Sequence, residues 1–487
     1  MRERKKSSIP YWIPSPLPSP GGRGNSALYF VQRPNLCRTV LGFCLTARRA
    51  PTNQQLLHYF LLFFLLLFTP CNSITADNTP LPLSLLPGVT SIEGQQAPLL
   101  LHQPISTIQV YALHGDRSEP IPFQIDERDN RNRWVLDQGP QLKSEDSPNV
   151  FDENDVLVLM NRDLGERGNL ARLPKEATAW VEVRVGSEAA PLGFVYVGIF
   201  AKIPIASLSH SQYTRYDAHA DKVDTDRYTI AFAGAPFPTH LAFVDHLGDT
   251  AANLIAGVRV IGEVRFLRGL FTLRRTEQDI HAEVLAYRQG AIRTIRRARY
   301  WIPLPLGFRT NGRIDVLFYR DFVEGTAIVK LKVPPRLVLA DGELQAYFRF
   351  LDLSGARLLV EGKESNSTVD GHMDTAEQAL QRCPARWAAL VLPNGRTLLL
   401  IARLEGALQR LEQRLYFDDH EPTEAQPGTK PAFGFEFSGI NQVETGTHRL
   451  SVFAIMLDTT SDDDIRRTIE RFLAPPAVSI TPLPASG

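Results

Sequence analysis

The chain has 487 residues, and its 53 Lys and Arg residues balance 53 Asp and Glu residues. This neutral formal charge argues against a protein whose whole surface is built for nucleic acid, so we expect no nucleic-acid partner. The chain also contains neither the HExxH spacing of a zinc protease nor the G-x-S-x-G elbow of a hydrolase. Composition and motifs therefore assign no activity.

An apolar run at residues 56–68 follows the basic pair Arg48-Arg49 and gives way to small and polar residues that end at Ala76. A run of about a dozen apolar residues is typical of a secretion signal, because a bilayer-spanning helix needs roughly 20. We therefore predict a signal peptide at residues 51–76 and no transmembrane helix after its removal. The expected location is secreted, periplasmic or at the cell surface.

Residues 1–50 are rich in Pro, Gly and Arg and lack apolar periodicity, so we predict a disordered leader. It is either a genuine extension or the result of a mis-assigned start, and we favour the second. Cleavage after Ala76 would leave Cys383 as the only cysteine and exclude an internal disulfide. Lipid attachment at Cys71 is an alternative that the preceding residues, Phe68-Thr69-Pro70, disfavour.

From residue 105 onwards, short apolar or alternating runs end at Gly, Pro, Asn or Asp, which is the pattern of β-strands. Helices long enough to connect parallel strands are missing. We therefore predict an all-β chain of antiparallel β-sandwich domains with a short C-terminal helix. The best strand candidates are residues 108–112, 180–185, 193–199, 228–232, 258–267, 313–319, 326–333, 344–351 and 448–457.

The sharpest local signal is Asn394-Gly395, which joins two apolar runs. Both central positions of a tight hairpin turn need positive φ, and these two residues tolerate it best, so we predict a β-hairpin. Ser461 can cap a helix that extends to residue 473, stops before Pro475 and packs on the last sheet. Leucines at residues 404–415 recur at helical spacing, and that segment is either a second helix or a strand edge.

Two polar stretches, residues 201–226 and 361–374, suggest domain boundaries. The predicted organisation is an extended Pro- and Leu-rich segment at 77–104, an N-terminal β domain at 105–200, a central β domain at 201–360, a flexible loop at 361–374, a C-terminal hairpin region with the terminal helix at 375–476, and a tail at 477–487.

The segment IPFQIDERD at residues 121–129, followed by FDENDVLVLM at 151–160, resembles a pattern found in secreted bacterial β-rich proteins of unassigned function. In those proteins a PxQxD strand precedes an acidic DELVF strand, and some members accompany polysaccharide-degrading genes. This chain lacks the DxDG spacing often found between the two runs. The resemblance implies carbohydrate-related work and gives no residue a role.

Carboxylates gather in the same two runs, among them Asp126, Asp129, Asp152 and Asp155. Oxygen ligands collected in this way suit calcium, the one cofactor that the sequence suggests. The alternative is a solvated surface that the interleaved arginines neutralise, and we favour this alternative. No segment matches the full calcium-binding loop, so a calcium site would need ligands from separated segments.

Positive charge gathers between residues 259 and 299, where ten Arg residues accompany four carboxylates. On a strand, Arg293, Arg297, Arg299 and Trp301 share one face. Guanidinium groups beside an aromatic ring suit an anionic glycan such as a uronate or sulfated sugar. The alternative, which we favour, is that the Arg-rich strands form salt bridges with the acidic segments.

Several histidines lie in residues 210–246 among Tyr and Asp residues, and Tyr216, His219 and His246 are the candidates for a catalytic base. A Tyr or His base with an Arg that neutralises a carboxylate is what proton abstraction beside a uronate requires. Loop histidines are more often plain surface. We therefore favour a non-catalytic binding or envelope-associated scaffold, whose partner is an anionic glycan or an envelope protein. The alternatives are a lyase or hydrolase acting on acidic polysaccharide, and a subunit of an extracellular assembly.

Overall fold

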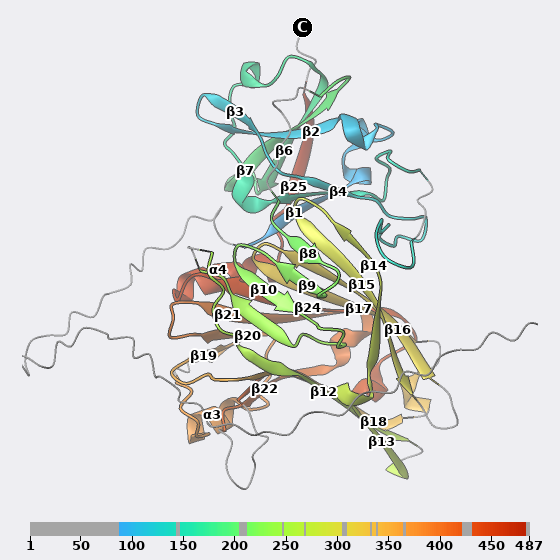
Figure 1. The fold of residues 1–487 in the computed structure, drawn as a ribbon, viewed down its shortest axis with the longest axis vertical. Coiled ribbons are helices and arrows are strands. Elements are labelled where there is room, and N and C mark those ends of the chain that lie inside the picture. The colour runs from blue at the N-terminus through green and yellow to red at the C-terminus, as the bar shows by residue number, and fades with distance from the viewer. Residues whose placement is uncertain are drawn as a thin grey trace, which may run out of the picture. The chain divides into compact units, whose positions relative to one another are not determined.

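The computed structural model describes residues 87–142, 147–203, 212–245, 248–266, 269–303, 309–331, 334–337, 339–363, 367–420 and 431–483 (Figure 1). The predicted leader and signal peptide lie outside these residues. The fold is all-β, as predicted, with antiparallel sheets and a short helix near the C-terminus. Each of the nine best strand candidates overlaps an observed strand.

The N-terminal segment forms a two-sheet sandwich around buried aliphatic side chains that include Ile92, Val110, Leu157 and Val183. One sheet has the order β1-β5-β4 and the other β25-β6-β7-β2-β3, all antiparallel. Their bounds are β1 Val89–Glu93, β2 Ile108–His114, β3 Arg117–Pro120, β4 Gln124–Asp126, β5 Val156–Met160, β6 Ala177–Gly186, β7 Pro191–Phe200 and β25 Val478–Leu483.

Two of the predicted boundary segments belong to this sandwich. β1 pairs with β5 and Leu100 is buried, so residues 89–100 enter the core instead of running over the surface. The predicted tail contributes β25, which pairs with β6 and lies among strands from the opposite end of the chain (Figure 1). The sandwich therefore closes only when residues some 300 positions apart come together.

The rest of the chain forms an eight-stranded sheet, β14-β15-β16-β17-β24-β21-β20-β19, a five-stranded sheet, β13-β12-β18-β23-β22, and a four-stranded sheet, β11-β10-β9-β8. Both larger sheets combine strands from before and after the predicted loop at 361–374. Their bounds are β8 Arg215–Asp217, β9 Lys222–Asp224, β10 Tyr228–Ala231, β11 His240–Phe243, β12 Ile255–Phe266, β13 Phe271–Thr276, β14 His281–Gln289, β15 Arg293–Pro303, β16 Arg309–Tyr319, β17 Phe322–Leu331, β18 Leu339–Phe350, β19 Arg357–Val360, β20 Trp387–Val391, β21 Thr397–Glu405, β22 Glu412–Asp418, β23 Ala432–Ser438 and β24 Gly446–Leu457.

Both faces of the eight-stranded sheet are covered. On one face, side chains such as Phe318 and Leu400 form a common hydrophobic core with Phe435 of the five-stranded sheet. The other face packs against helix α4, Asp462–Leu473, through Ile465 and Phe472. Strands buried on both faces lose the simple alternation of apolar and polar residues, which explains near-continuous runs such as residues 397–402.

The C-terminal helix and the hairpin are confirmed with one correction. The Ser461 side chain accepts the N–H of Asp464 as the predicted cap. Strands β20 and β21 form the predicted hairpin, but of the two turn residues only Gly395 has positive φ, at 84°. The loop is therefore longer than a two-residue turn, with Leu392 and Arg396 closing it by a hydrogen bond of 2.7 Å.

The leucine segment at residues 404–415 contains the end of β21, a 3-10 turn at Gly406–Arg410 and the start of β22, which agrees with the strand alternative. A second α-helix, α3, covers Thr375–Leu380 and lies beside β22. Within the described residues, every helix is too short or too polar to cross a bilayer.

Candidate functional site

The acidic and arginine-rich segments meet at Asp126, on β4 of the sandwich. Arg293 of β15 places Nε and Nη2 at 2.9 and 2.8 Å from Asp126 Oδ2, and Arg288 of β14 places Nε at 3.2 Å from Oδ1. Asp126 is 1% exposed and Arg293 3% exposed. This pair is the salt bridge between acidic and basic strands that we favoured from the sequence.

Trp134 completes this junction. The guanidinium groups of Arg128 and Arg293 lie over its ring, at 4.2 and 4.7 Å from the centroid. Arg293 Nη1 also donates to Tyr319 Oη at 2.6 Å. Cation–π contacts and charge-assisted hydrogen bonds thus occupy the Arg293 guanidinium inside the protein. It is not available to a glycan from solvent.

The other predicted ligand-binding residues continue outwards along β15. Arg297 is 3% exposed and makes two hydrogen bonds of 2.7 Å to Asp315 of the next strand. Arg299 pairs with Glu283, and the Trp301 ring stacks on His281 with centroids 5.3 Å apart. The predicted common face is present, but its arginines are already paired: Arg293 with Asp126 of the sandwich, and Arg297 and Arg299 with carboxylates of their own sheet.

The predicted calcium ligands are spread over several hydrogen-bonding arrangements. Asp129 holds Arg133 and two backbone N–H groups; although burial opposes the change, these hydrogen bonds lower the pKa of Asp129. Asp155 accepts the N–H groups of Arg128 and Asp152, and burial raises its pKa to about 6. Among the described residues, no three carboxylate, His or Cys side chains are grouped for a metal ion. Calcium at these residues stays a prediction.

The three candidates for a catalytic base do not come together in the described structure. Tyr216 is buried and donates to Asp221 at 2.8 Å, and burial raises the pKa of its hydroxyl. Asp221 in turn holds Arg296 by bonds of 2.7 and 2.6 Å. His219 lies exposed in a turn, and His246 lies outside the described residues. The Tyr216 network therefore supports the fold.

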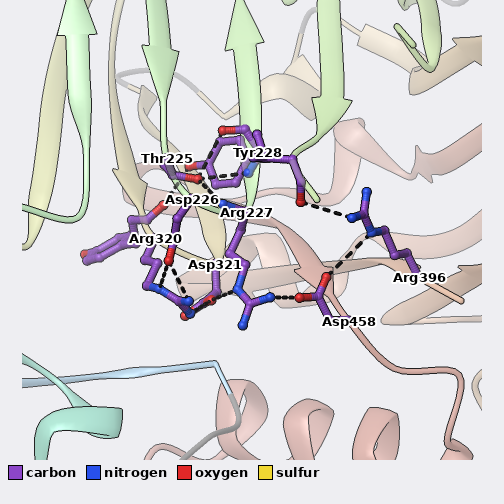
Figure 2. Close-up of polar contacts among 10 residues, drawn as sticks. Thr225, Asp226, Arg227, Tyr228, Arg320, Asp321, Arg396 and Asp458 are labelled. Atoms are coloured by element: carbon purple, nitrogen blue, oxygen red, sulfur yellow. Dashed lines mark hydrogen bonds and ion pairs between the residues drawn. The ribbon is translucent and has the colours of Figure 1, made fainter. Parts of the chain in front are cut away.

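An ion-pair network that the sequence did not reveal joins the β9–β10 loop to the turn between β16 and β17 (Figure 2). Arg320, 6% exposed, donates from Nε and Nη2 to Asp226 at 3.0 and 2.7 Å and from Nη1 to Asp321. Burial raises the pKa of Asp321, and nearby arginines oppose that shift. Tyr228 donates to the carbonyl oxygens on both sides of this turn.

The network continues through Arg227, which pairs with Asp321 and with Asp458 at the end of β24 (Figure 2). Asp458 also lies 3.7 Å from Arg396 of the β20–β21 hairpin. Positive and negative groups alternate and each has a partner. Such a network links the four-stranded sheet to the end of the eight-stranded sheet and leaves none of these charged groups unpaired.

The outer face of the five-stranded sheet differs from these satisfied clusters. Register places Tyr347 of β18, Gly434 of β23 and Tyr416 of β22 in one row across the sheet. The two tyrosine rings stack with centroids 4.0 Å apart and an interplanar angle of 6°. A Cβ at residue 434 would lie 2.3 Å from the Ala346 carbonyl oxygen, so glycine is what allows this close approach.

Polar groups surround the tyrosine pair on the same face. The Gln345 amide donates to Glu343 at 2.7 Å and to Glu436 at 3.2 Å, and burial raises the pKa of Glu436. Arg349, two residues beyond Tyr347, is half-buried; its Nε is buried without a hydrogen-bond partner, and its side chain forms no ion pair among the described residues. Its cross-strand neighbour on β23 is the small residue Ala432.

No protein-family model matches the chain, and no curated protein matches it significantly. Among solved structures, the chain is similar to an alpha-mannosidase from Enterococcus faecalis V583, with 9% identity and a TM-score of 0.43 over 82% of this chain and 45% of that one. It is also similar to the alpha-N-acetylgalactosaminidase NagBb from Bifidobacterium bifidum, with 11% identity and a TM-score of 0.32 over 54% of this chain and 38% of that one. The chain spans less than half the length of both enzymes, and these TM-scores carry no argument about function.

Proposed function

We propose that the chain is a non-catalytic scaffold that binds an acidic glycan on the outer face of the five-stranded sheet. The observation that carries the proposal is the stacked pair Tyr347 and Tyr416 beside Arg349, an arginine without an ion-pair partner in the described structure. Tyr416 is the half-buried member of the pair and Tyr347 the buried one, so it is Tyr416 that offers a sugar an apolar body and a polar tip. An arginine fork recognises a carboxylate or sulfate by two parallel hydrogen bonds.

The outer face of the five-stranded sheet and the predicted glycan site on β15 differ in whether their arginines are already paired with carboxylates. Arg293 and Arg297 already hold Asp126 and Asp315 and are nearly inaccessible. Arg349 has no such partner, and its neighbours in the register of the sheet are Gly257, which has no side chain, and the small residue Ala432. An anion that approaches this face can reach the guanidinium without breaking an existing ion pair.

Retention on immobilised alginate or pectate tests the proposal. Arg349→Gln should reduce salt-sensitive retention about tenfold or more, since one lost charge-assisted contact costs about 1.5–3 kcal/mol. Tyr416→Ala should also weaken retention, on these matrices and on a neutral glucan. Arg265→Gln is the matched control, because Arg265 is exposed on the same face and pairs with Asp341. Equal retention by the parent and Arg349→Gln would contradict the proposal.

One observation favours a second candidate, hydrolysis of a glycosidic bond. Glu343 and Glu436 share the Gln345 amide, and burial holds the pKa of Glu436 above its usual range. A carboxylic acid of raised pKa beside a second carboxylate is the pair that glycosidases use. Release of reducing ends from a polysaccharide, abolished in both Glu343→Gln and Glu436→Gln, would establish this alternative and replace the non-catalytic scaffold.

A further inference from the structure

Two buried carboxylates, Glu377 and Asp419, lie away from every arginine cluster described above. Glu377 belongs to the first turn of α3 and is 1% exposed; Asp419 directly follows β22 and is 0% exposed. Asp419 lines a cavity of about 230 Å³ together with Gly371, Val369 and Pro431. Neither carboxylate forms an ion pair among the described residues, and the same holds for the adjacent Asp370 and Asp374 in this part of the chain.

Each buried carboxylate uses one oxygen and leaves the other without a partner. Asp419 Oδ2 accepts the N–H groups of Asp370 and Gly371 at 3.1 and 3.3 Å, and Glu377 Oε2 accepts the N–H of Asp374 at 3.0 Å. Asp419 Oδ1 and Glu377 Oε1 are buried and have no hydrogen-bond partner in the described structure. A buried carboxylate oxygen without a partner needs a proton, a water molecule or a cation to replace the hydration that it has lost.

The surrounding charge favours the cation. Asp370 and Asp374 place two more negative groups beside the pair, and each of their recorded hydrogen bonds comes from a backbone N–H. Carboxylates that carry charge in this part of the chain repel one another. A divalent ion would reduce this repulsion and supply the partner that each buried free oxygen lacks.

We propose that Glu377 and Asp419 are ligands of a calcium site between α3 and the end of β22, completed by backbone carbonyl and water oxygens. Calcium takes six to eight oxygens and accepts carbonyl groups and waters besides carboxylates. Such a site does not need three grouped side-chain ligands, which the described residues lack here. It is distinct from the predicted ligand Asp126, whose oxygens Arg288 and Arg293 already occupy.

Thermal unfolding and isothermal titration of the full chain with CaCl2 after EGTA treatment test this site. The parent should bind about one calcium ion, and its Tm should rise by about 1–2 °C at a concentration near ten times Kd. Asp419→Asn and Glu377→Gln keep the shape of each side chain and remove its charge. Both variants should lose the calcium-induced shift, and in EGTA they should melt at or above the parent, because the repulsion is relieved.

Asp352→Asn is the matched control. Asp352 lines the same cavity, but its Oδ1 already accepts two hydrogen bonds from Ser354, so the calcium-induced shift should be unchanged. Absence of calcium binding by the parent would overturn the proposal. It would also be overturned if Asp419→Asn and Glu377→Gln lowered Tm equally with calcium and with EGTA, since that result assigns both carboxylates a structural role. If one variant fails to fold, the calcium-induced shift of the other variant decides whether the ion binds at this pair.

Discussion

The junction at Asp126 and the outer face at Arg349 use the same residue type in opposite ways. Arg293 is buried between Asp126, Tyr319 and Trp134, whereas Arg349 has no ion-pair partner in the described residues. A buried arginine must have its charge compensated by the protein, because water cannot do so. An arginine without a partner at a partly exposed position remains available to a ligand. Whether an arginine is already paired within the protein therefore distinguishes a structural arginine from one that can bind a ligand.

Arg293→Gln should produce the largest change. The substitution leaves the Asp126 carboxylate buried without its main partner and removes the cation–π contact with Trp134. Breaking one side of a buried pair typically costs about 3–5 kcal/mol of unfolding free energy. Urea denaturation with a two-state fit measures it, and glycan retention by the folded fraction should be unchanged. A loss below about 1 kcal/mol would show that the junction is not what holds these strands.

Gly434→Ala should cost about 1–3 kcal/mol, because the added Cβ meets backbone atoms of Ala346 and Tyr347 at 2.3 and 2.5 Å and forces β18 and β23 apart. The tyrosine pair lies directly over this position, so glycan retention should fall as well. Gly262→Ala on β12 is the matched control in the same sheet, since nothing lies within 4 Å of its added Cβ. Similar urea midpoints for the two variants would contradict this account of Gly434.

The sequence predicted local structure better than it predicted the arrangement of sheets. Ser461 and Gly395 act through neighbours a few residues away, so cap and hairpin could be predicted from short segments. The pairing of β25 with β6 joins residues about 300 positions apart, and no local pattern specifies it. For the same reason, the sequence separated segments 201–360 and 375–476 although both contribute strands to the two larger sheets.

The candidate site was harder to predict, because partners decide the role of a charged residue. Composition drew attention to the ten arginines between residues 259 and 299, and the alternation on β15 placed Arg293 and Arg297 on one face. Nothing in the sequence indicated that Tyr347 and Tyr416 would stack across Gly434, since register between three strands determines that contact. The sequence offered one signal for the ion-pair network around Arg320, namely the charged pair Arg320-Asp321 between the aromatic residues Tyr319 and Phe322.

Asp163→Asn should have an effect of intermediate size, and the effect is on how the unfolding free energy depends on pH. Burial raises the pKa of Asp163, although Tyr213 donates to both of its oxygens. The folded state therefore holds its proton to higher pH than the unfolded state, and stability falls as pH rises from about 4 through the raised folded pKa. Asparagine still accepts from Tyr213 and cannot ionise. The unfolding free energy of the parent should fall relative to that of the variant as pH rises through this window, and a difference that stays constant between pH 3.5 and 7 would contradict the assignment.

Arg299→Gln should give the smallest effect and provides the internal control for the comparison. Arg299 lies on the same face of β15 as Arg293 and also has a carboxylate partner, Glu283, but both side chains of this pair are more than 40% exposed. Water screens an exposed pair, and ordering two long side chains offsets most of the attraction, so the loss should stay below about 0.5 kcal/mol. Because strand, face and substitution match those of Arg293→Gln, the difference in urea midpoint between the two variants isolates the contribution of burial. Equal losses from Arg293→Gln and Arg299→Gln would mean that pairing at the junction contributes no more than a surface ion pair.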